Sequence, residues 1–130
     1  MRKILSGLIF AAVVCWSAVA FAQEVDDDTV NVGPRGTATQ SSEGWGGNPM
    51  RAIDGNTDGQ WGAGTTTHTN GANSWWEVDL GDVYDIGAVR MWNRMDCCRE
   101  CLAAITVEVL GADRSVAFSQ GGLDALSAQT

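Results

Sequence analysis

The sequence predicts an all-β domain built as an antiparallel β-sandwich. Apolar and polar residues alternate in short runs, Gly- and Asp-containing turns separate these runs, and no window after Asn31 repeats apolar residues at helical spacing. Short alternating strands without intervening helices are typical of two packed antiparallel sheets.

The predicted strands cover residues 36–42, 75–80, 86–92, 105–109 and 115–119. In the second of them, alternation places Trp76, Val78 and Leu80 on one face and the acidic residues on the other, which we interpret as the solvated face. Four or five strands are few for a closed sandwich. Either a partner completes the strand pairing, or the chain is a fragment of a longer protein.

The first 22 residues are predicted to be a secretory signal peptide. A positively charged start and an apolar run over 4–19 precede the cleavage pattern Ala20-Phe21-Ala22. The apolar run is too short for a membrane span, so we expect no membrane insertion after cleavage. The expected product is secreted, periplasmic or on the cell surface, with an acidic leader over 23–30 and one domain over 31–130.

Composition excludes several classes of function. The chain has 16 acidic residues against 8 Lys and Arg, which gives a formal net charge of −8. Nucleic acids and anionic membranes repel such a domain, whereas neutral sugars and divalent cations do not. His68, the single histidine, has no Ser or Cys nucleophile context, and no isolated carboxylate pair stands out, so the sequence predicts no enzyme.

A long polar segment, residues 43–73, separates the first two predicted strands. Segments of this length without periodicity are uncommon inside a compact domain and tend to be functional. Within it, residues 51–59 offer the carboxylate, amide and backbone oxygens that Ca²⁺ prefers. A plain turn, in which Asp54 and Asn56 hydrogen-bond their own backbone, is the simpler alternative.

Arg94 and Asp96 lie where the third predicted strand gives way to a loop. A neighbouring carboxylate holds a guanidinium rigid and leaves its other donors for neutral hydroxyls. Cys97, Cys98 and Cys101 follow, and export favours one disulfide among them, with one thiol left over. Zinc held by these cysteines and the single histidine is an alternative, although the spacing matches no common zinc framework.

Several segments carry a family resemblance: GTATQSS at 36–42, AIDGN at 52–56, THT at 67–69, SWWEVDLG at 74–81 and NRMDCC at 93–98. In this order they resemble the F-type lectins (fucolectins), which belong to the discoidin-like, or F5/8 type C-like, jelly-roll group. The histidine together with the Arg-x-Asp-Cys-Cys motif is the most specific part. The resemblance covers residues 31 to about 110 and implies a discoidin-like jelly roll that lacks its C-terminal strands.

The resemblance also implies a shallow site for terminal L-fucose. His68 and Arg94 match the family's polar sugar contacts, and Asp96 matches the acid that steadies the arginine. Cys97 and Cys98 would form a vicinal disulfide that packs against the sugar ring.

Trp45 and Trp61, in the long segment, are candidates for an aromatic wall against the fucose methyl group, with packing of the loop as the alternative role. The resemblance further implies a bound Ca²⁺ ion. Its implied ligands are Asp54, Thr65 and the backbone carbonyls of Arg51 and Asn56.

The sequence departs from the family at two places. The family's second basic sugar-binding residue falls at Cys101, and loss of its charge-assisted bonds corresponds to roughly 1.5–3 kcal/mol, or about ten- to a hundredfold in affinity. Arg99 is a candidate substitute, whereas a Cys98–Cys101 bridge would replace the vicinal disulfide. The family's C-terminal strands, which supply a further acidic Ca²⁺ ligand, are also missing.

The leading hypothesis is a secreted, Ca²⁺-stabilised, non-catalytic lectin domain for fucosylated glycans. One alternative is a discoidin-like structural or adhesion module without fucose binding. Another is the N-terminal binding module of a larger exported glycoside hydrolase. Single-site lectins bind sugars weakly, so useful avidity would need a homo-oligomer or a longer multidomain parent.

Overall fold

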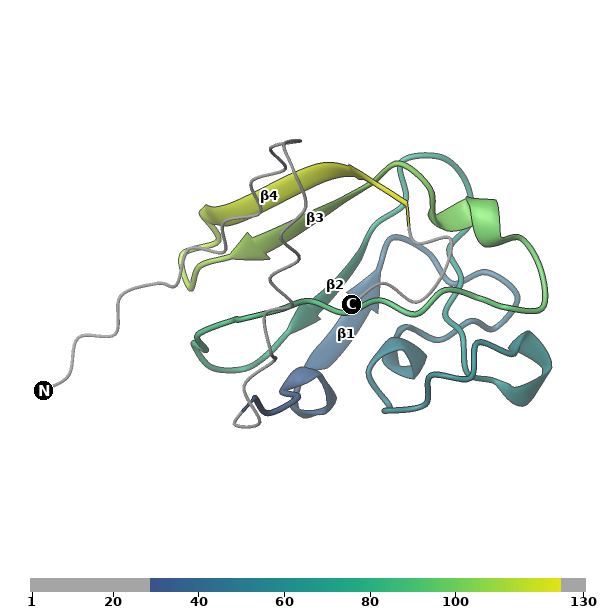
Figure 1. Cartoon of the computed structure of the whole chain (residues 1–130), viewed down its shortest axis with the longest axis horizontal. Helices are drawn as coiled ribbons and strands as arrows, with labels where there is room; N and C mark the ends of the chain where they lie inside the picture. Colours follow the sequence, from purple (N-terminus) through teal and green to yellow (C-terminus); the bar gives the residue numbers. More distant parts are fainter. Residues whose placement is uncertain (1–28, 125–130) are drawn as a thin grey trace, which may run out of the picture.

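The computed structural model describes residues 29–124 (Figure 1). The elements in chain order are η1 (Gly33–Arg35), β1 (Thr37–Gln40), η2 (Pro49–Ala52), η3 (Trp61–Ala63), β2 (Trp76–Asp79), η4 (Arg99–Leu102), β3 (Ile105–Leu110) and β4 (Val116–Leu123). The predicted signal peptide and most of the acidic leader lie outside the described residues. Within 29–124, no helix has the length and apolar character needed to cross a membrane.

The strands form two antiparallel pairs, β1 with β2 and β3 with β4. The first pair runs from Thr37 opposite Asp79 to Gln40 opposite Trp76. The second pair contains two register irregularities along β3. Figure 1 shows the β3–β4 pair above the β1–β2 pair, with the long segment between β1 and β2 gathered at one end.

Four of the predicted strands are confirmed, with small changes at their ends. The runs at 36–42, 75–80 and 105–109 become β1, β2 and β3. The predicted strand at 115–119 becomes β4 and extends to Leu123, because Leu123 still pairs with Ile105 at the start of β3.

The predicted strand at 86–92 is wrong. Met91 alone forms an isolated bridge, and the rest of this run is irregular. Neither of the two strand pairs within residues 29–124 includes this run, and Val89 and Trp92 are 50% and 49% exposed. The run contains strand-forming residue types, but a strand forms only where a neighbour completes the ladder.

An ion pair joins the two strand pairs. Arg114, in the turn between β3 and β4, donates from Nη1 and Nη2 to the two carboxylate oxygens of Glu77 in β2, each at 2.9 Å. This hydrogen bonding lowers the pKa of Glu77. The apolar core of the described residues is small, since only Ala38 and Ile53 among their apolar side chains are buried.

Side chains from β1 and β2 fix the long segment between them. Gln40 Nε2 donates to the carbonyls of Gly47 at 2.9 Å and His68 at 3.1 Å. Trp76 Nε1 donates to the carbonyl of Pro49 at 3.0 Å. Two short 3-10 turns, η2 and η3, are the only regular elements that the structure describes in this segment. The loop is therefore held by polar contacts to the sheet rather than by a strand ladder of its own.

Candidate functional site

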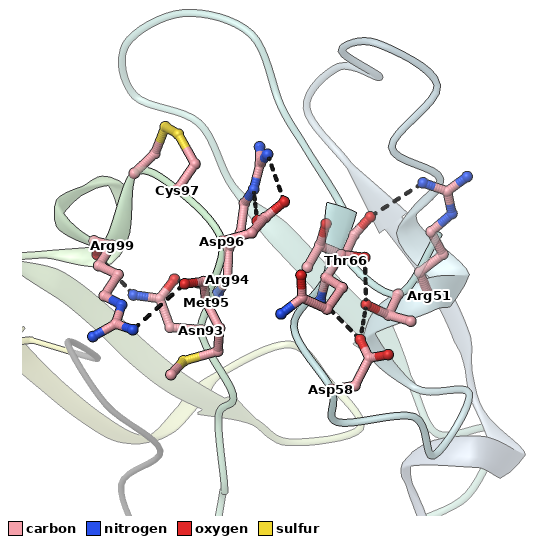
Figure 2. Close-up of polar contacts among 12 residues, drawn as sticks. Arg51, Asp58, Thr66, Asn93, Arg94, Met95, Asp96, Cys97 and Arg99 are labelled. Carbon is pink, nitrogen blue, oxygen red and sulfur yellow. Dashed lines mark hydrogen bonds and ion pairs between the residues drawn. A yellow bond between two sulfur atoms is a disulfide. The ribbon is translucent and has the colours of Figure 1, made fainter. Parts of the chain in front are cut away.

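Arg94 and Asp96 form the predicted ion pair. Arg94 Nε lies 2.5 Å from Asp96 Oδ1, and Nη2 lies 3.3 Å from Oδ2, which makes the contact two-pronged (Figure 2). Both side chains are about one quarter to one third exposed, at 26% and 30%. The hydrogen bond from Arg94 lowers the pKa of Asp96, so this carboxyl stays charged at neutral pH.

Asn93 fixes the backbone that carries this pair. It is one of the few buried polar residues, with 6% of its surface exposed. Its Oδ1 accepts from the Arg94 amide, and its Nδ2 donates to the Arg99 carbonyl, both at 2.7 Å. Asn93 thereby closes the loop between Arg94 and η4. Its position directly before the Arg-x-Asp-Cys-Cys motif was the sequence signal for this role.

Trp61, at the start of η3, brings the predicted site residues together. The Arg94 guanidinium carbon lies 5.1 Å from the Trp61 ring centroid, and that of Arg51 lies 5.9 Å away. The His68 ring meets the indole edge-on at 5.7 Å. Cations over the indole face are attracted by its quadrupole. Of the two roles considered for Trp61, these contacts favour packing that positions Arg94 and His68.

Trp45 does not share these contacts. Its side chain is 85% exposed, and its backbone has a positive φ of 53°. Within residues 29–124, the ring contacts of the site run through Trp61 rather than Trp45. The structure therefore brings one of the two predicted tryptophans into the site and leaves the other on the surface.

Two glycines make room for His68. A Cβ at Gly47 would lie 2.5 Å from the His68 amide nitrogen and 2.6 Å from its Cβ, and a Cβ at Gly44 would collide with Nδ1. The Gly44 amide donates to the His68 carbonyl at 2.9 Å, and the His68 amide donates to the Gly47 carbonyl at 3.1 Å. The Gly-Trp-Gly-Gly run at 44–47 was the signal for this close approach.

The cysteines adopt the pairing that the resemblance implies. Cys97 and Cys98 are joined by a disulfide, and Cys101 is an exposed free thiol. Figure 2 shows the disulfide at Cys97 and the Arg94 guanidinium directed to the same side of the segment, upward in this view.

Arg99, the candidate substitute for the second basic residue, is directed away from the disulfide and Arg94 (Figure 2). Its guanidinium points to the opposite side in Figure 2 and donates to the Met95 carbonyl at 3.4 Å. Of Arg94 and Arg99, only Arg94 directs its guanidinium to the side of the disulfide (Figure 2), and Cys101 itself lies in η4.

The predicted cation loop is wound by successive side-chain-to-backbone hydrogen bonds. Asp54 accepts from the Asn56 amide at 2.8 Å, and Asn56 accepts from the Asp58 amide at 3.2 Å. Asp58 accepts from the Gln60 amide at 2.8 Å and from the Thr65 hydroxyl at 2.6 Å. The Thr65 bond, followed by the Gln60 bond, lowers the pKa of Asp58. Asp54 and Asn56 therefore hydrogen-bond to the nearby backbone, as the simpler alternative of a plain turn predicts. Asp58 continues the same series of hydrogen bonds, although it is not among the Ca²⁺ ligands that the resemblance implies.

The loop offers oxygen atoms rather than the sulfur and nitrogen ligands that are typical of a zinc site. Within residues 29–124, no group of three or more His, Cys, Asp or Glu side chains is arranged to hold a metal. Thr65 is 7% exposed, and its hydroxyl oxygen lies 2.6 Å from Asp58 Oδ1 and 2.9 Å from the Gln60 carbonyl oxygen. Arg51 Nη1 donates to the Thr66 carbonyl at 3.3 Å, which links the start of this segment to its end. Hydroxyl, carboxylate and backbone oxygens suit Ca²⁺.

Comparison with known proteins identifies the family. Residues 51–118 match the F5/F8 type C family described as NedA-like, galactose-binding domain. Fucolectin-4 of Anguilla japonica is 45% identical over 82 residues, covering 59% of this chain and 46% of the relative. The fucolectin of Anguilla anguilla is 42% identical over 85 residues, covering 61% and 54%. The chain belongs to the F-type lectin (fucolectin) family. It spans about half the length of these curated relatives.

Solved structures agree with this assignment of an F-type lectin domain. The lectin domain of lectinolysin complexed with Lewis B antigen is 35% identical, with a TM-score of 0.71 over 75% of this chain and 70% of that one. A Streptococcus pneumoniae fucose binding module is also 35% identical, with a TM-score of 0.70 and the same coverage. The predicted discoidin-like β-sandwich is confirmed. The expectation of a non-catalytic module agrees with relatives that are named as lectins or binding modules.

Proposed function

We propose that this domain binds fucosylated glycans, with terminal fucose held by His68, Arg94 and the Cys97–Cys98 disulfide. The observation that carries the proposal is the Arg94–Asp96 pair supported by the Trp61 ring. Two of the five guanidinium N–H groups go to Asp96, and the others remain for sugar hydroxyls. The fucolectins and the fucose binding module among its relatives support the same ligand class.

Each group has a distinct role in this proposal. Arg94 donates to hydroxyl oxygens in a fixed direction because Asp96 holds it on one side and Trp61 on another. His68 offers one ring nitrogen to a hydroxyl while its other nitrogen, Nδ1, lies buried beside Gly44. The disulfide supplies an apolar surface for the sugar ring. Fucose is neutral, so the acidic surface of the domain does not oppose its binding.

A Ca²⁺ ion is part of the proposal. Asp54, the Thr65 hydroxyl and the carbonyls of Arg51 and Asn56 would hold it. When bound, the cation would neutralise the loop's carboxylate charge and tie the two ends of the loop together. Because η3 and Trp61 lie between these ends, the bound ion would stabilise the platform beneath Arg94.

The same proposal places the protein outside the cytoplasm, on the support of the predicted signal peptide over residues 1–22. A shallow single site binds sugar weakly, so we include a homo-oligomer or a longer multidomain parent as the source of avidity.

A discoidin-like adhesion module without fucose binding is the second candidate. The observation that favours it is the replacement of the second basic residue by Cys101, which Arg99 does not compensate. Such a module would have the same fold but would not bind fucose.

Retention of the purified protein on fucose-coupled resin tests the proposal, with circular dichroism as a folding check. We expect retention that free fucose releases and that a chelator weakens. A folded protein that passes through the resin would favour the adhesion module. Retention that is unchanged by chelator would remove Ca²⁺ from the proposal and leave the sugar site intact.

A further inference from the structure

The free thiol of Cys101 lies one tight turn away from the disulfide. The Cys101 amide donates to the Cys98 carbonyl at 3.0 Å, which closes a turn at the start of η4. Residues joined by such a turn have Cα atoms less than about 7 Å apart. Disulfides span Cα separations of about 4.4–6.8 Å. The Cα separation of Cys98 and Cys101 therefore falls in the range that a disulfide can span.

All the participants are open to solvent and share the candidate sugar site. Cys97, Cys98 and Cys101 are each exposed. The pKa of Arg94 is raised chiefly by its hydrogen bond to Asp96, and a thiolate at Cys101 would act in the same direction. The thiol is thus within electrostatic reach of the guanidinium that the proposed function assigns to sugar binding. A change of partner among these cysteines alters the surface beside Arg94.

We propose that Cys101 exchanges with the Cys97–Cys98 disulfide and that this exchange switches the sugar site between two forms. In the first form, Cys97 and Cys98 are joined and Cys101 is free, as the structure shows. In the second form, Cys98 and Cys101 are joined and Cys97 is free. The switching role rests on the proposed fucose binding, whereas the exchange itself does not.

The step is balanced without an external oxidant. The Cys101 thiolate attacks Sγ of Cys98, the Cys98–Cys101 bond forms, and the Cys97–Cys98 bond breaks. Cys97 leaves as a thiolate and takes a proton from water. One disulfide and one thiol are present on each side of the step.

The two forms differ in the surface that the sugar meets. The first presents two bonded sulfur atoms side by side as an apolar face next to Arg94. The second turns one of them toward η4 and leaves a lone thiol at Cys97. Losing an apolar contact of this size corresponds to about a tenfold fall in fucose affinity.

Peptide mapping of the free thiol tests the exchange directly. Trypsin cleaves after Arg94, Arg99 and Arg114, so residues 95–99 carry Cys97 and Cys98, while residues 100–114 carry Cys101. The full-length protein would be incubated at about pH 8, where thiolate is available, and then trapped with excess N-ethylmaleimide before digestion. Any label on Cys15 falls on a separate peptide, residues 4–35, and does not interfere.

We expect label on both peptides, together with a disulfide-linked pair of 95–99 and 100–114. Label confined to 100–114 would overturn the exchange. An equal mixture of isotopically heavy and light protein shows whether the exchange is internal, because an internal bond links only peptides of the same isotope. Linked pairs of mixed isotope would also overturn the proposal, in favour of bonding between chains.

Two locked variants test the effect on the sugar site. Cys101→Ser leaves only the vicinal disulfide, and Cys97→Ser leaves only the Cys98–Cys101 pairing. We expect about tenfold weaker retention on fucose resin for Cys97→Ser than for Cys101→Ser. Equal retention would overturn the switch while leaving the proposed function in place. A failure of both variants and of the parent protein to bind fucose, with exchange still visible in the peptide map, would overturn the proposed function and with it the switching role.

Discussion

The guanidinium carbon of Arg94 lies 5.1 Å from the centroid of the Trp61 ring, while Asp96 binds the same guanidinium from the side. The arginine is therefore fixed by two unlike contacts, one with an aromatic face and one with a carboxylate. His68 meets the same indole edge-on. A single tryptophan in the long loop thus sets the spacing between two groups of the candidate site.

Trp61→Ala should weaken fucose retention by about tenfold, because both His68 and Arg94 lose a packing surface. Trp61→Phe should recover part of this loss, since a smaller ring keeps one aromatic face. The measurement is the fucose concentration that elutes half of the protein from fucose resin. Trp45→Ala is the matched control, because Trp45 is 85% exposed and lies outside these ring contacts. Equal losses from the two alanine variants would show that Trp61 has no special role.

Asp96→Asn should also weaken binding by about tenfold at neutral pH, because the amide keeps the shape of the carboxylate without its charge. The acid dependence is a sharper test. Arg94 lowers the pKa of Asp96, so the carboxylate remains charged as the pH falls through the ordinary value of about 3.9 and is lost only below it. The contribution of Asp96 to fucose retention should therefore persist as the pH falls to about 5 and be lost only below about pH 3.9.

The Asp96→Asn variant serves as the control for that profile. Its retention should be lower throughout and should show a smaller acid decline, because the titrating group is gone. If the decline of the parent protein were centred near pH 6 or persisted in the variant, another group would be responsible.

Much of the fold follows from local sequence patterns: alternation predicted β2 and β3, and a run rich in Thr and Ser predicted β1. The failure at 86–92 has a different origin. Ile86, Val89 and Met91 have the residue types of a strand, yet a strand needs a neighbour to accept its hydrogen bonds. Strand pairing depends on the whole chain, so it cannot be deduced from the residue types of one segment.

Some contacts of the candidate site could be predicted from the sequence, and others could not. Arg94 and Asp96 could be paired from sequence because the partners are two residues apart. The support of Arg94 by Trp61 could not, because it joins residues in separate loops whose distance depends on the tertiary fold. For the same reason, sequence offered two equivalent tryptophans, and only the structure separates Trp61 from Trp45.

Gly47→Ala tests the close approach at His68. The added Cβ would lie 2.6 Å from the His68 Cβ, so either the histidine moves or the loop does. Overpacking of this kind costs about 1–3 kcal/mol of unfolding free energy, and the displaced ring should reduce fucose retention as well. Gly62→Ala is the control in the same loop, because its Cβ would meet nothing within 4 Å. Chemical denaturation and resin retention should both distinguish the two variants; identical behaviour would contradict the packing argument.

Cys101→Arg should strengthen fucose binding by about tenfold or more, since it restores charge-assisted donors at the position where the family resemblance expects a basic residue. Titration calorimetry with fucose gives the affinity. Cys101→Ser controls for the loss of the thiol without adding charge. A gain shared by both variants would assign the effect to the thiol, and a gain in neither would show that the side chain at 101 does not reach the sugar.

Chelation should destabilise the domain through the loop that contains Asp54 and Thr65. A ligand present at a hundred times its Kd stabilises the folded state by about 2.7 kcal/mol, which corresponds to roughly 10 °C in Tm for a domain of this size. We therefore expect EDTA to lower the Tm by about 10 °C and excess Ca²⁺ to restore it. Asp54→Asn should start from the lower Tm and respond little to either treatment, because one charged ligand is absent. Asp85→Asn, an exposed change outside this loop, should respond as the parent protein does. If Ca²⁺ still raised the Tm of Asp54→Asn by the full amount, the cation would be bound elsewhere. The loop would then be stabilised only by the hydrogen-bonded turns of Asp54, Asn56 and Asp58.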